Sequence, residues 1–325
     1  MIYTIAAMPD AQPSLPDLAP LAPAALLDAL LAPGELAAQV QRALAEDLGS
    51  AGDVTGTAMI PAERTARAVV RVRRDGVVCG TPVAAEVLRQ AAPGTAVSFH
   101  AADGERLEAG ANVLSLEGPL RGILAAERTL LNYLGRLSGI ATLTAAYAAR
   151  TAGTKAAVCD TRKTTPGMRM LEKWAVRCGG GTNHRIGLFD AMLVKDNHVA
   201  GLAPREMAEA VARAAAAARA AHALRFVEVE CDTIDQVRAI LALPKGTVDM
   251  VLLDNMQPDA IRVAVAARDA AAPAVLLEAS GGIDLDDVAA YAAAGVDRIS
   301  VGALTHSAPC LDVGLDIDVA PAPTA

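Results

Sequence analysis

The segment FVEVECDTIDQVRAILALPKGTVDMVLLD, residues 226–254, determines the fold class of this 325-residue chain. An apolar run at 226–229 stops at the polar cluster ECDT, a helical pattern covers 234–242, and a second apolar run at 250–253 stops at Asp254. A buried strand, a helix and another buried strand in this order are typical of a parallel sheet with crossover helices. The segment therefore predicts an α/β fold.

The same unit recurs along the second half of the chain. Further apolar runs end at polar or glycine-rich clusters at 156–159, 191–194, 275–277 and 298–301, and helical patterns cover 205–221, 258–271 and 286–294. Six such strands with polar carboxyl ends favour an α/β barrel over an open sheet, in which polar residues would gather at one crevice.

In a barrel, the residues that follow successive strands point into one mouth. We therefore expect these residues to converge there: Arg162, Lys163, Lys195, Glu230, Asp254, Ser280 and Gly302. The alternative is that each is merely a cap or loop residue at the end of its own strand. Charged residues at consecutive strand ends favour a shared site.

The first part of the chain has a different pattern. A helix is predicted over 34–49, strand-like patterns occur at 65–78, 96–100 and 112–117, and a helical pattern covers 125–142. Asp75-Gly76 within the first strand-like stretch is typical of a hairpin turn. We predict a flexible leader over 1–33, whose prolines cannot continue a helix, an α/β domain over 34–140, and the barrel over 141–305.

Composition argues against several classes of function. A formal charge of −8 and a pI near 5.2, with aromatic residues at 2%, do not fit nucleic-acid binding, which requires a basic face and stacking rings. Charged residues interrupt the Ala-rich stretch 207–224, so no membrane span is predicted there. The five cysteines are scattered and lack a CxxC pair, which indicates reduced thiols of a cytoplasmic protein and argues against a zinc site.

Residues 160–198 stand out because they hold seven Lys/Arg against four Asp/Glu in an otherwise acidic chain. Cations held close together repel one another unless a bound carboxylate or phosphate compensates them, so the segment indicates a small anionic ligand. The alternative is a solvated basic helix face, because Arg169, Lys173 and Arg177 are spaced four apart. His184 follows the glycines 179–181, so we expect it on an irregular loop, although a lone histidine is more often structural.

Two glycine-rich turns end the last two predicted strands, at 278–282 (EASGG) and 300–303 (SVGA). Barrels often bind phosphate on these loops, and the alternative is a pair of ordinary strand-to-helix turns. Glu230 and Asp254 end neighbouring strands, where two carboxylates could share Mg²⁺ or stabilise positive charge on a substrate. The alternative is that each pairs with a nearby Lys or Arg. Neither a Walker A loop nor a dinucleotide-binding glycine fingerprint follows a suitable strand.

From about Leu36 to Ile317 the chain resembles quinolinate phosphoribosyltransferase, also called nicotinate-nucleotide pyrophosphorylase (carboxylating). The resemblance rests on eight segments in the order of that family. They are EDLGSAGDVT, AERTLLNYLGRLSGIAT, DTRKTTPGMRMLEKWAV, GGGTNHRIGLFDAMLVKDNH, VEVECDT, VLLDNM, EASGGI and SVGALTHS.

The resemblance implies an N-terminal α/β sandwich domain, joined by the C-terminal segment 306–320, and an incomplete C-terminal α/β barrel. It also implies transfer of phosphoribosyl from phosphoribosyl pyrophosphate to quinolinate with decarboxylation, giving nicotinate mononucleotide, pyrophosphate and CO₂ in de novo NAD synthesis. Family members are homodimers with shared sites, and some assemble into hexamers.

The resemblance further implies roles for individual residues. Arg162, His184 and Arg185 would hold the quinolinate carboxylates, with Arg128 reaching in from the other subunit. Lys163 and Lys195 would lie near both substrates. The remaining matched residues are Glu230 and Asp254, which would face the ribose and its Mg²⁺, and Ser280, Gly281, Gly282 and Gly302, which would hold the 5-phosphate.

Two other functions remain open from the sequence. One is a relative of the same fold that acts on another acceptor, such as a nicotinate phosphoribosyltransferase or a protein linked to molybdenum transport. The other is a non-catalytic binder of a phosphorylated metabolite. The intact quinolinate motifs argue against the first, and the retained charged residues of the mouth argue against the second.

Overall fold

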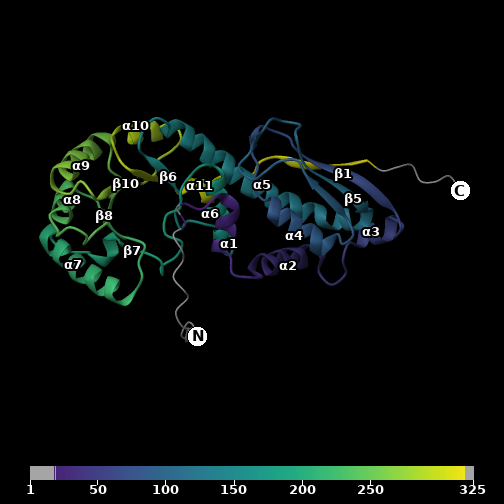
Figure 1. Ribbon diagram of the computed structural model, residues 1–325, viewed down its shortest axis with the longest axis horizontal. Helices are drawn as coiled ribbons and strands as arrows, with labels where there is room; N and C mark the ends of the chain where they lie inside the picture. The colour runs from purple at the N-terminus through teal and green to yellow at the C-terminus, as the bar shows by residue number, and fades with distance from the viewer. Residues whose placement is uncertain (1–17, 19, 319–325) are drawn as a thin grey trace.

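The computed structural model describes residue 18 and residues 20–318, which form two α/β lobes side by side (Figure 1). One lobe is built on a parallel sheet and the other on an antiparallel sheet. A single long helix, α5 (Leu120–Thr151), runs between them. The predicted domain boundary at 140–141 falls inside this helix, so both lobes pack on the same element.

The parallel sheet has six strands in the order β6-β11-β10-β9-β8-β7. All six predicted strands are present. They are β6 (Ala157–Cys159), β7 (Met192–Val194), β8 (Val227–Cys231), β9 (Met250–Asp254), β10 (Leu276–Ser280) and β11 (Arg298–Ser300). Within the described residues β6 and β7 do not pair with each other, so the barrel is incomplete, as the family resemblance implied.

An irregular loop lies along the free edge of β6. The amide of Thr182 donates to Val158 O at 2.8 Å, and the amide of Asp160 donates to Thr182 O at 3.2 Å. This pairing carries the loop over the carboxyl end of β6. His184 therefore lies on the irregular loop where it was predicted.

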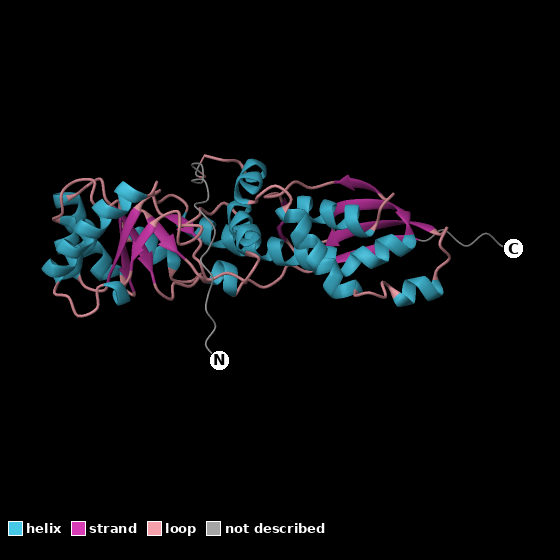
Figure 2. Ribbon diagram, turned by 90° about the horizontal axis from the view of Figure 1, so that it is seen from below, coloured by secondary structure: helices cyan, strands magenta, loops and turns pink. Residues whose placement is uncertain are grey.

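Helices pack around the parallel sheet (Figure 2). Local sequence explains their starts, because proline occupies the first turn of two of them and Thr233 caps α8 by accepting from the amide of Gln236 at 3.3 Å. The bounds of the elements are α6 (Arg169–Cys178), the 3₁₀ helix η1 (Asp196–His198), α7 (Pro204–Ala221), α8 (Ile234–Leu241), α9 (Pro258–Ala271), α10 (Val288–Ala293) and α11 (Ala303–His306).

The N-terminal lobe contains a four-stranded antiparallel sheet in the order β12-β1-β5-β3, with helices packed against it (Figure 2). Its strands are β1 (Thr65–Val72), β3 (Ala96–Phe99), β5 (Asn112–Pro119) and β12 (Val313–Asp318), and a separate pair is formed by β2 (Gly76–Val77) and β4 (Arg106–Leu107). Its helices are α2 (Glu35–Leu48), α3 (Val54–Met59) and α4 (Thr81–Ala91). The α/β sandwich expected from the family resemblance is therefore present.

The prediction of a hairpin at Asp75-Gly76 is wrong, because β1 and β2 do not pair with each other. Both edges of β1 are already paired, one with β5 and the other with β12, so β2 has no free edge of β1 to join. It pairs with β4 instead. A turn signal shows that the chain reverses, but it does not show which strand will be the partner.

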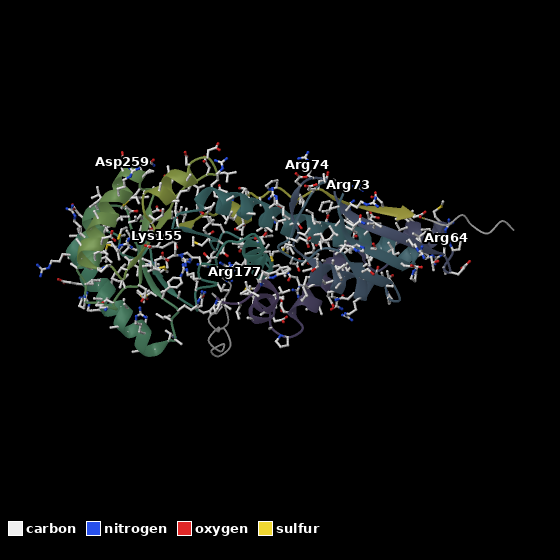
Figure 3. The ribbon with its side chains drawn as sticks, turned by 45° about the horizontal axis from the view of Figure 1, so that its top comes forward. Arg64, Arg73, Arg74, Lys155, Arg177 and Asp259 are labelled. Carbon is white, nitrogen blue, oxygen red and sulfur yellow. The ribbon has the colours of Figure 1, made fainter. Side chains whose placement is uncertain are left out.

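Strand β12 brings the C-terminal part of the chain back to the N-terminal lobe. It pairs antiparallel with β1 from Arg67 opposite Asp318 to Val72 opposite Val313. Asp316 accepts hydrogen bonds from Arg73 at 2.6 Å and Arg71 at 3.0 Å, on the side of the lobe where Figure 3 labels Arg73. The last residues of the predicted joining segment, 319 and 320, lie outside the described residues.

The prediction of a flexible leader over 1–33 is wrong for its last part. A helix, α1 (Pro23–Leu30), buries three leucines and packs on α6, where Trp174 Nε1 donates to Pro23 O at 2.8 Å. Arg177, labelled in Figure 3, donates to Leu18 O at 3.0 Å. Proline is compatible with this helix because at the first position its missing N–H would be unpaired anyway. Residues 1–17 and 19 lie outside the described part of the leader.

The lengths and compositions of the helices bear on membrane insertion. α5 is the longest, with 32 residues, and it carries several charged side chains. Among residues 18 and 20–318, no helix combines the length and the apolar character needed to cross a bilayer.

Candidate active site

A cavity of about 770 Å³ opens at the carboxyl ends of the parallel strands. Parallel strands end on the same side of a sheet, so residues far apart in sequence meet there. The cavity brings together eleven of the predicted site residues, which are Arg162, Lys163, His184, Arg185, Lys195, Glu230, Asp254, Ser280, Gly281, Gly282 and Gly302. The alternative in which each residue is only a local cap does not account for one shared cavity.

Arg128 is the exception. It lies exposed on α5 and lines a separate cavity of about 280 Å³, together with Glu46, Asp47 and Met168. The structure therefore does not bring Arg128 into the barrel mouth of its own chain.

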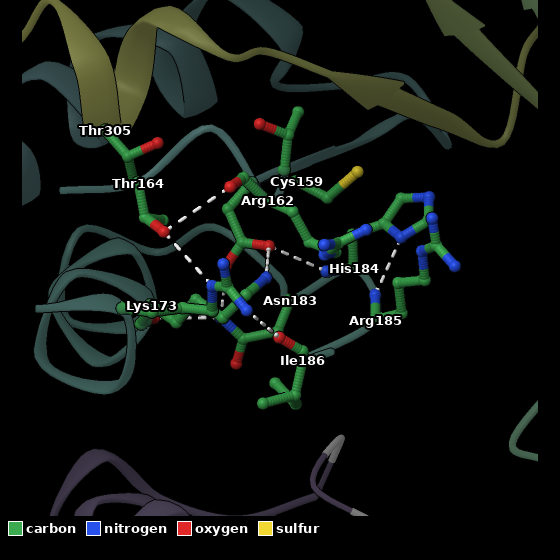
Figure 4. Close-up of polar contacts among 12 residues, drawn as sticks. Cys159, Arg162, Thr164, Lys173, Asn183, His184, Arg185, Ile186 and Thr305 are labelled. Atoms are coloured by element: carbon green, nitrogen blue, oxygen red, sulfur yellow. Dashed lines mark hydrogen bonds and ion pairs between the residues drawn. The ribbon is translucent and has the colours of Figure 1, made fainter. Parts of the chain in front are cut away.

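The loop that carries Asn183 and His184, both labelled in Figure 4, is anchored by Asp160, which lies directly after β6. Its carboxylate accepts hydrogen bonds from Asn183 Nδ2 at 2.6 Å and from the amide of His184 at 2.9 Å, and it forms an ion pair with Lys173 of α6. The side chains of both Asp160 and Lys173 are 0% exposed. Lys173 is thus a buried structural cation, and the alternative of a solvated helix face is wrong for it.

The glycine run before His184 allows this loop to pack closely on α5. A Cβ atom at Gly179 would lie 2.3 Å from the carbonyl oxygen of Ala141, closer than any side chain tolerates. Gly180 has φ of +84°, a left-handed conformation that glycine adopts without strain. The glycines therefore position the loop and need not contact a ligand.

Two arginines form the cationic wall of the cavity. Arg162 follows β6, and Arg185 follows His184 and is 8% exposed. Burial and the nearby charge of Arg162 lower the pKa of Arg185. Arg162 Nε is buried and has no hydrogen-bond partner among the described residues. Two neighbouring guanidinium charges and a free donor at the wall suit an anionic ligand.

His184 lies at the base of this wall with both ring nitrogens next to protein groups. Nε2 lies 2.9 Å from Glu228 Oε2 and 3.3 Å from Glu278 Oε1, and Nδ1 accepts a hydrogen bond from the amide of Arg185 at 2.7 Å. Burial lowers the pKa of His184, but the two carboxylates raise it more, to about 9. Nδ1 can accept this hydrogen bond only in the neutral ring, because both nitrogens of the imidazolium carry a proton. Protonation of His184 therefore requires the Arg185 amide to turn away from Nδ1, and the cation then adds positive charge to the wall.

The carboxylates under His184 belong to a buried charged cluster inside the barrel. Arg298 Nε donates to Glu278 Oε2 at 2.7 Å, and the Glu228 and Glu278 side chains are 0% exposed. Burial alone would raise the pKa of Glu278. The positive charges of His184 and Arg298 outweigh this effect and hold the pKa well below its usual range. His184, Glu228 and Glu278 have possible metal-ligand atoms within 4.8 Å of one another, yet the direct contacts of the imidazole already account for the cluster by charge pairing.

Sequence analysis missed Glu228, Glu278 and Arg298. One signal was available, because Glu228 and Glu230 are two apart on β8 and must face the same side of the sheet. If Glu230 points into the barrel, Glu228 does so one layer deeper. Glu278 likewise lies two residues before Ser280 on β10, but its pairing with Arg298 depends on the register of β10 and β11, which no local pattern gives.

The predicted acidic pair, Glu230 and Asp254, lines the same cavity. Burial raises the pKa of Asp254, the negative charge of Glu230 raises it further, and Lys195 opposes them. The two carboxylates are therefore close enough to interact. Glu230 forms an ion pair with Lys195, which is the alternative considered for it, whereas Asp254 forms no ion pair with any described residue. Asn255 Nδ2 donates to Asp254 Oδ2 at 2.6 Å.

The two glycine-rich turns complete the cavity. Gly281 and Gly282 have φ of +102° and +59°, a conformation that favours glycine. Because neither residue has a side chain, the backbone of the turn after β10 is open to the cavity that both residues line. A Cβ atom at Gly302 would lie 3.1 Å from both Lys163 Cδ and His306 Nε2. His306 also lines the cavity and was not singled out from the sequence, although it lies within the SVGALTHS segment.

Fold and cavity together define a two-domain α/β-barrel enzyme whose cavity is lined by cationic side chains and by a pair of carboxylates. Family models described as the N-terminal and C-terminal domains of quinolinate phosphoribosyl transferase match residues 53–138 and 140–316. The chain belongs to this family, as its motifs predicted.

Known proteins similar to the chain carry the names of this family. A nicotinate-nucleotide pyrophosphorylase [carboxylating] of Mycobacterium leprae is 45% identical over 280 residues, covering 86% of this chain and 95% of that protein. The solved structure of the nicotinate-nucleotide pyrophosphorylase from Francisella tularensis aligns with a TM-score of 0.78 at 36% identity, covering 89% of this chain and 98% of the other. That of NadC from Streptococcus pyogenes aligns with a TM-score of 0.81 at 34% identity, covering 89% and 99%.

Proposed function

We propose that this chain transfers the phosphoribosyl group of phosphoribosyl pyrophosphate to the ring nitrogen of quinolinate and releases pyrophosphate, CO₂ and nicotinate mononucleotide, a step of de novo NAD synthesis. The observation that carries the proposal is the single cavity that cationic side chains, two carboxylates and two glycine-rich turns line together. An acidic aromatic ring and a sugar phosphate together need this combination of groups.

Each part of the cavity has a role in this proposal. Arg162, His184 and Arg185 hold the two quinolinate carboxylates, because guanidinium groups bind carboxylates through paired hydrogen bonds. Lys163 and Lys195 lie between the substrates and stabilise the departing pyrophosphate. The 5-phosphate is held by backbone amides and a hydroxyl of the late turns, from Ser280, Gly281, Gly282 and Gly302.

The proposed chemistry separates charge along one line. The bond from the ribose carbon to the pyrophosphate oxygen breaks and its electron pair leaves with pyrophosphate, while the quinolinate nitrogen supplies the pair for the new bond. Glu230 and Asp254 stabilise the positive charge on the sugar, and the lysines stabilise the negative charge of the leaving group. Holding both substrates in one cavity reduces the entropic cost of their meeting. No covalent intermediate with the protein is required.

Loss of the carboxylate next to the ring nitrogen completes the reaction. When CO₂ leaves, the electron pair remains at the ring carbon, where the adjacent positively charged nitrogen stabilises it until a proton takes its place. The protein therefore contributes little beyond orientation at this step. A variant that accumulates the undecarboxylated nucleotide would contradict this part of the proposal.

Mg²⁺ is the cofactor we propose, and Glu230 and Asp254 are the residues that would hold it. The donor set fits, because Mg²⁺ takes one or two carboxylates and completes its shell with substrate phosphates and water. The raised pKa of Asp254 beside Glu230 indicates negative charge that a divalent cation would compensate. When bound, the ion neutralises charge on the pyrophosphate.

We further propose a homodimer in which Arg128 completes the quinolinate site of the partner subunit. Its exposed position away from its own barrel mouth supports this assignment. Arg128→Ala should abolish quinolinate binding and leave the fold intact, and mixing it with Lys163→Ala chains should restore activity. Random pairing of equal amounts leaves about one quarter of all sites intact. Mixed dimers without recovered activity would contradict a shared site, and sedimentation would show whether dimers assemble further.

The cytoplasm is the location we propose, because all five cysteines are free thiols and four of them are buried. Cell fractionation with antibody detection of the chain would test the proposal, and recovery outside the cytoplasmic fraction would contradict it.

The reaction itself is tested by incubating the chain with phosphoribosyl pyrophosphate, Mg²⁺ and either quinolinate or nicotinate. We expect equal amounts of CO₂ and pyrophosphate with quinolinate, and little pyrophosphate with nicotinate, which lacks the second carboxylate. Equal use of nicotinate would assign the chain to another acceptor, and binding of both substrates without turnover would make it a binding protein.

A further inference from the structure

Asn255 has an unusual backbone conformation at the edge of the cavity. Its φ is +53°, and it is the one non-glycine residue of the described chain in the left-handed region. It directly follows Asp254 at the end of β9 and lines the cavity. Few residues other than glycine adopt this conformation, and asparagine is among those that do so most often.

The contacts of Asn255 join two neighbouring strand ends. Its side-chain amide donates to Asp254 Oδ2 at 2.6 Å, on its own strand. Its backbone amide donates to the carbonyl oxygen of Ser280 at 2.9 Å, at the end of β10. The register of the two strands places Ser280 opposite Asp254, so the backbone contact reaches across one step of the barrel while the side-chain contact stays on β9.

The turn after β10 is shaped to accept this side chain. A Cβ atom at Gly281 would lie 2.2 Å from Asn255 Oδ1 and 2.8 Å from its backbone nitrogen. Gly281 therefore leaves the space that Asn255 occupies. The two residues are matched, and a change at either one disturbs the other.

We propose that Asn255 is a positioning residue that fixes the Asp254 carboxylate relative to the turn of Ser280, Gly281 and Gly282. This assignment rests on the proposed function, in which Asp254 faces the ribose and the turn holds the 5-phosphate. Asn255 therefore belongs to the sugar-phosphate half of the site. A fixed distance between the Asp254 carboxylate and this turn selects substrates in which the ribose ring and its 5-phosphate are the matching distance apart. The cationic wall that holds quinolinate does not depend on it.

Few side chains satisfy the three requirements of this position. The backbone conformation favours glycine, asparagine and aspartate. Glycine has no donor for Asp254, and aspartate would place a second carboxylate against it. Asparagine alone combines the conformation, the donor and the absence of charge.

The experiment uses the full chain with Asn255→Gly and Asn255→Asp. Asn255→Gly keeps the backbone conformation and removes the donor, and Asn255→Asp keeps shape and conformation and replaces the donor by an acceptor. We expect KM for phosphoribosyl pyrophosphate to rise at least about tenfold in both variants, because each loses a hydrogen bond to a charged group. The rise should be larger in Asn255→Asp, because it also places a second carboxylate against Asp254. KM for quinolinate should stay within about twofold of the wild type.

Asn112→Asp on β5 is the matched control, since it makes the same chemical change in the other lobe, and all its parameters should match the wild type. Calorimetric binding of phosphoribosyl pyrophosphate alone gives a readout independent of turnover. If the wild type binds it but forms no product, the proposed function fails while the binding constants of the variants still test Asn255.

Two results would overturn the assignment of Asn255. One is an unchanged affinity for phosphoribosyl pyrophosphate in both variants. The other is an equal loss for both substrates together with a lower thermal midpoint, which would make the role of Asn255 structural. Absence of any binding of phosphoribosyl pyrophosphate by the wild type would overturn both proposals together.

Discussion

The two lobes use ion pairs in different ways. In the barrel lobe, Lys173 and Asp160 form an ion pair with both side chains 0% exposed, beneath the loop that carries His184. In the N-terminal lobe, Arg67 and Glu117 face each other across β1 and β5, and their side chains are 74% and 62% exposed. Water screens the exposed pair, whereas the buried pair is shielded from water and depends on the partner charge and on protein hydrogen bonds for compensation. The barrel lobe thus bears the desolvation cost of burying an ion pair, which holds these charges in fixed positions near its cavity. The exposed pair of the N-terminal lobe bears no such cost.

Breaking the buried pair should have the largest effect. Asp160→Ala leaves the Lys173 ammonium without its counter-charge and removes the acceptor of Asn183 and of the His184 amide. We expect a loss of about 3–5 kcal/mol in the free energy of unfolding, measured by urea denaturation. A loss below about 1 kcal/mol would mean that the pair is hydrated and that the contrast between the lobes does not hold.

Removing a cation from the cavity should come next and should affect activity. Lys195→Ala leaves Glu230 without its partner and removes positive charge between the substrates. We expect kcat/KM to fall by about a hundredfold to a thousandfold in steady-state assays. Lys245→Ala, an exposed lysine outside this cavity, is the matched control and should keep full activity.

The charge on His184 gives a pH dependence of smaller size. Its pKa in the folded protein, about 9, is raised above the ordinary value of 6.5, so the protonated ring stabilises the fold below about pH 6.5 and this contribution is lost as pH rises through 9. We expect a loss on the order of 2 kcal/mol between pH 6.5 and 9.5. Glu228→Gln removes one of the carboxylates that raise this pKa and should move the loss to lower pH. An identical pH profile in this variant would contradict the charge pairing of His184.

The exposed pair should give the smallest effect. Glu117→Ala removes the partner of Arg67 on the surface of the antiparallel sheet. We expect a change of about 0–1 kcal/mol in urea denaturation, further reduced by salt, since such pairs are screened. A cost equal to that of Asp160→Ala would show that burial does not explain the difference between the two pairs.

Much of the barrel lobe could be predicted from local patterns. All six strands appeared where an apolar run stops at a polar cluster, and α9 begins and ends where its periodicity does. The site could be predicted because parallel strands end on one side, so a residue such as Glu230 is placed by its position at a strand end. Other features could not be predicted, including the helix α1, the partner of β2 and the cluster of Glu278 and Arg298.

The amino-acid sequence by itself determined the order of strands and helices, the side of the barrel on which the charged residues meet, and the family to which the chain belongs. Periodicity, turn residues and motifs are properties of short segments, so they can be recognised without knowing what packs against them. Only the tertiary structure decided which charges are partners, such as Asp160 with Lys173 and His184 with Glu228. It also placed Arg128 outside its own barrel mouth. These arrangements depend on strand register and on burial, and both arise when segments distant in sequence come together and exclude water.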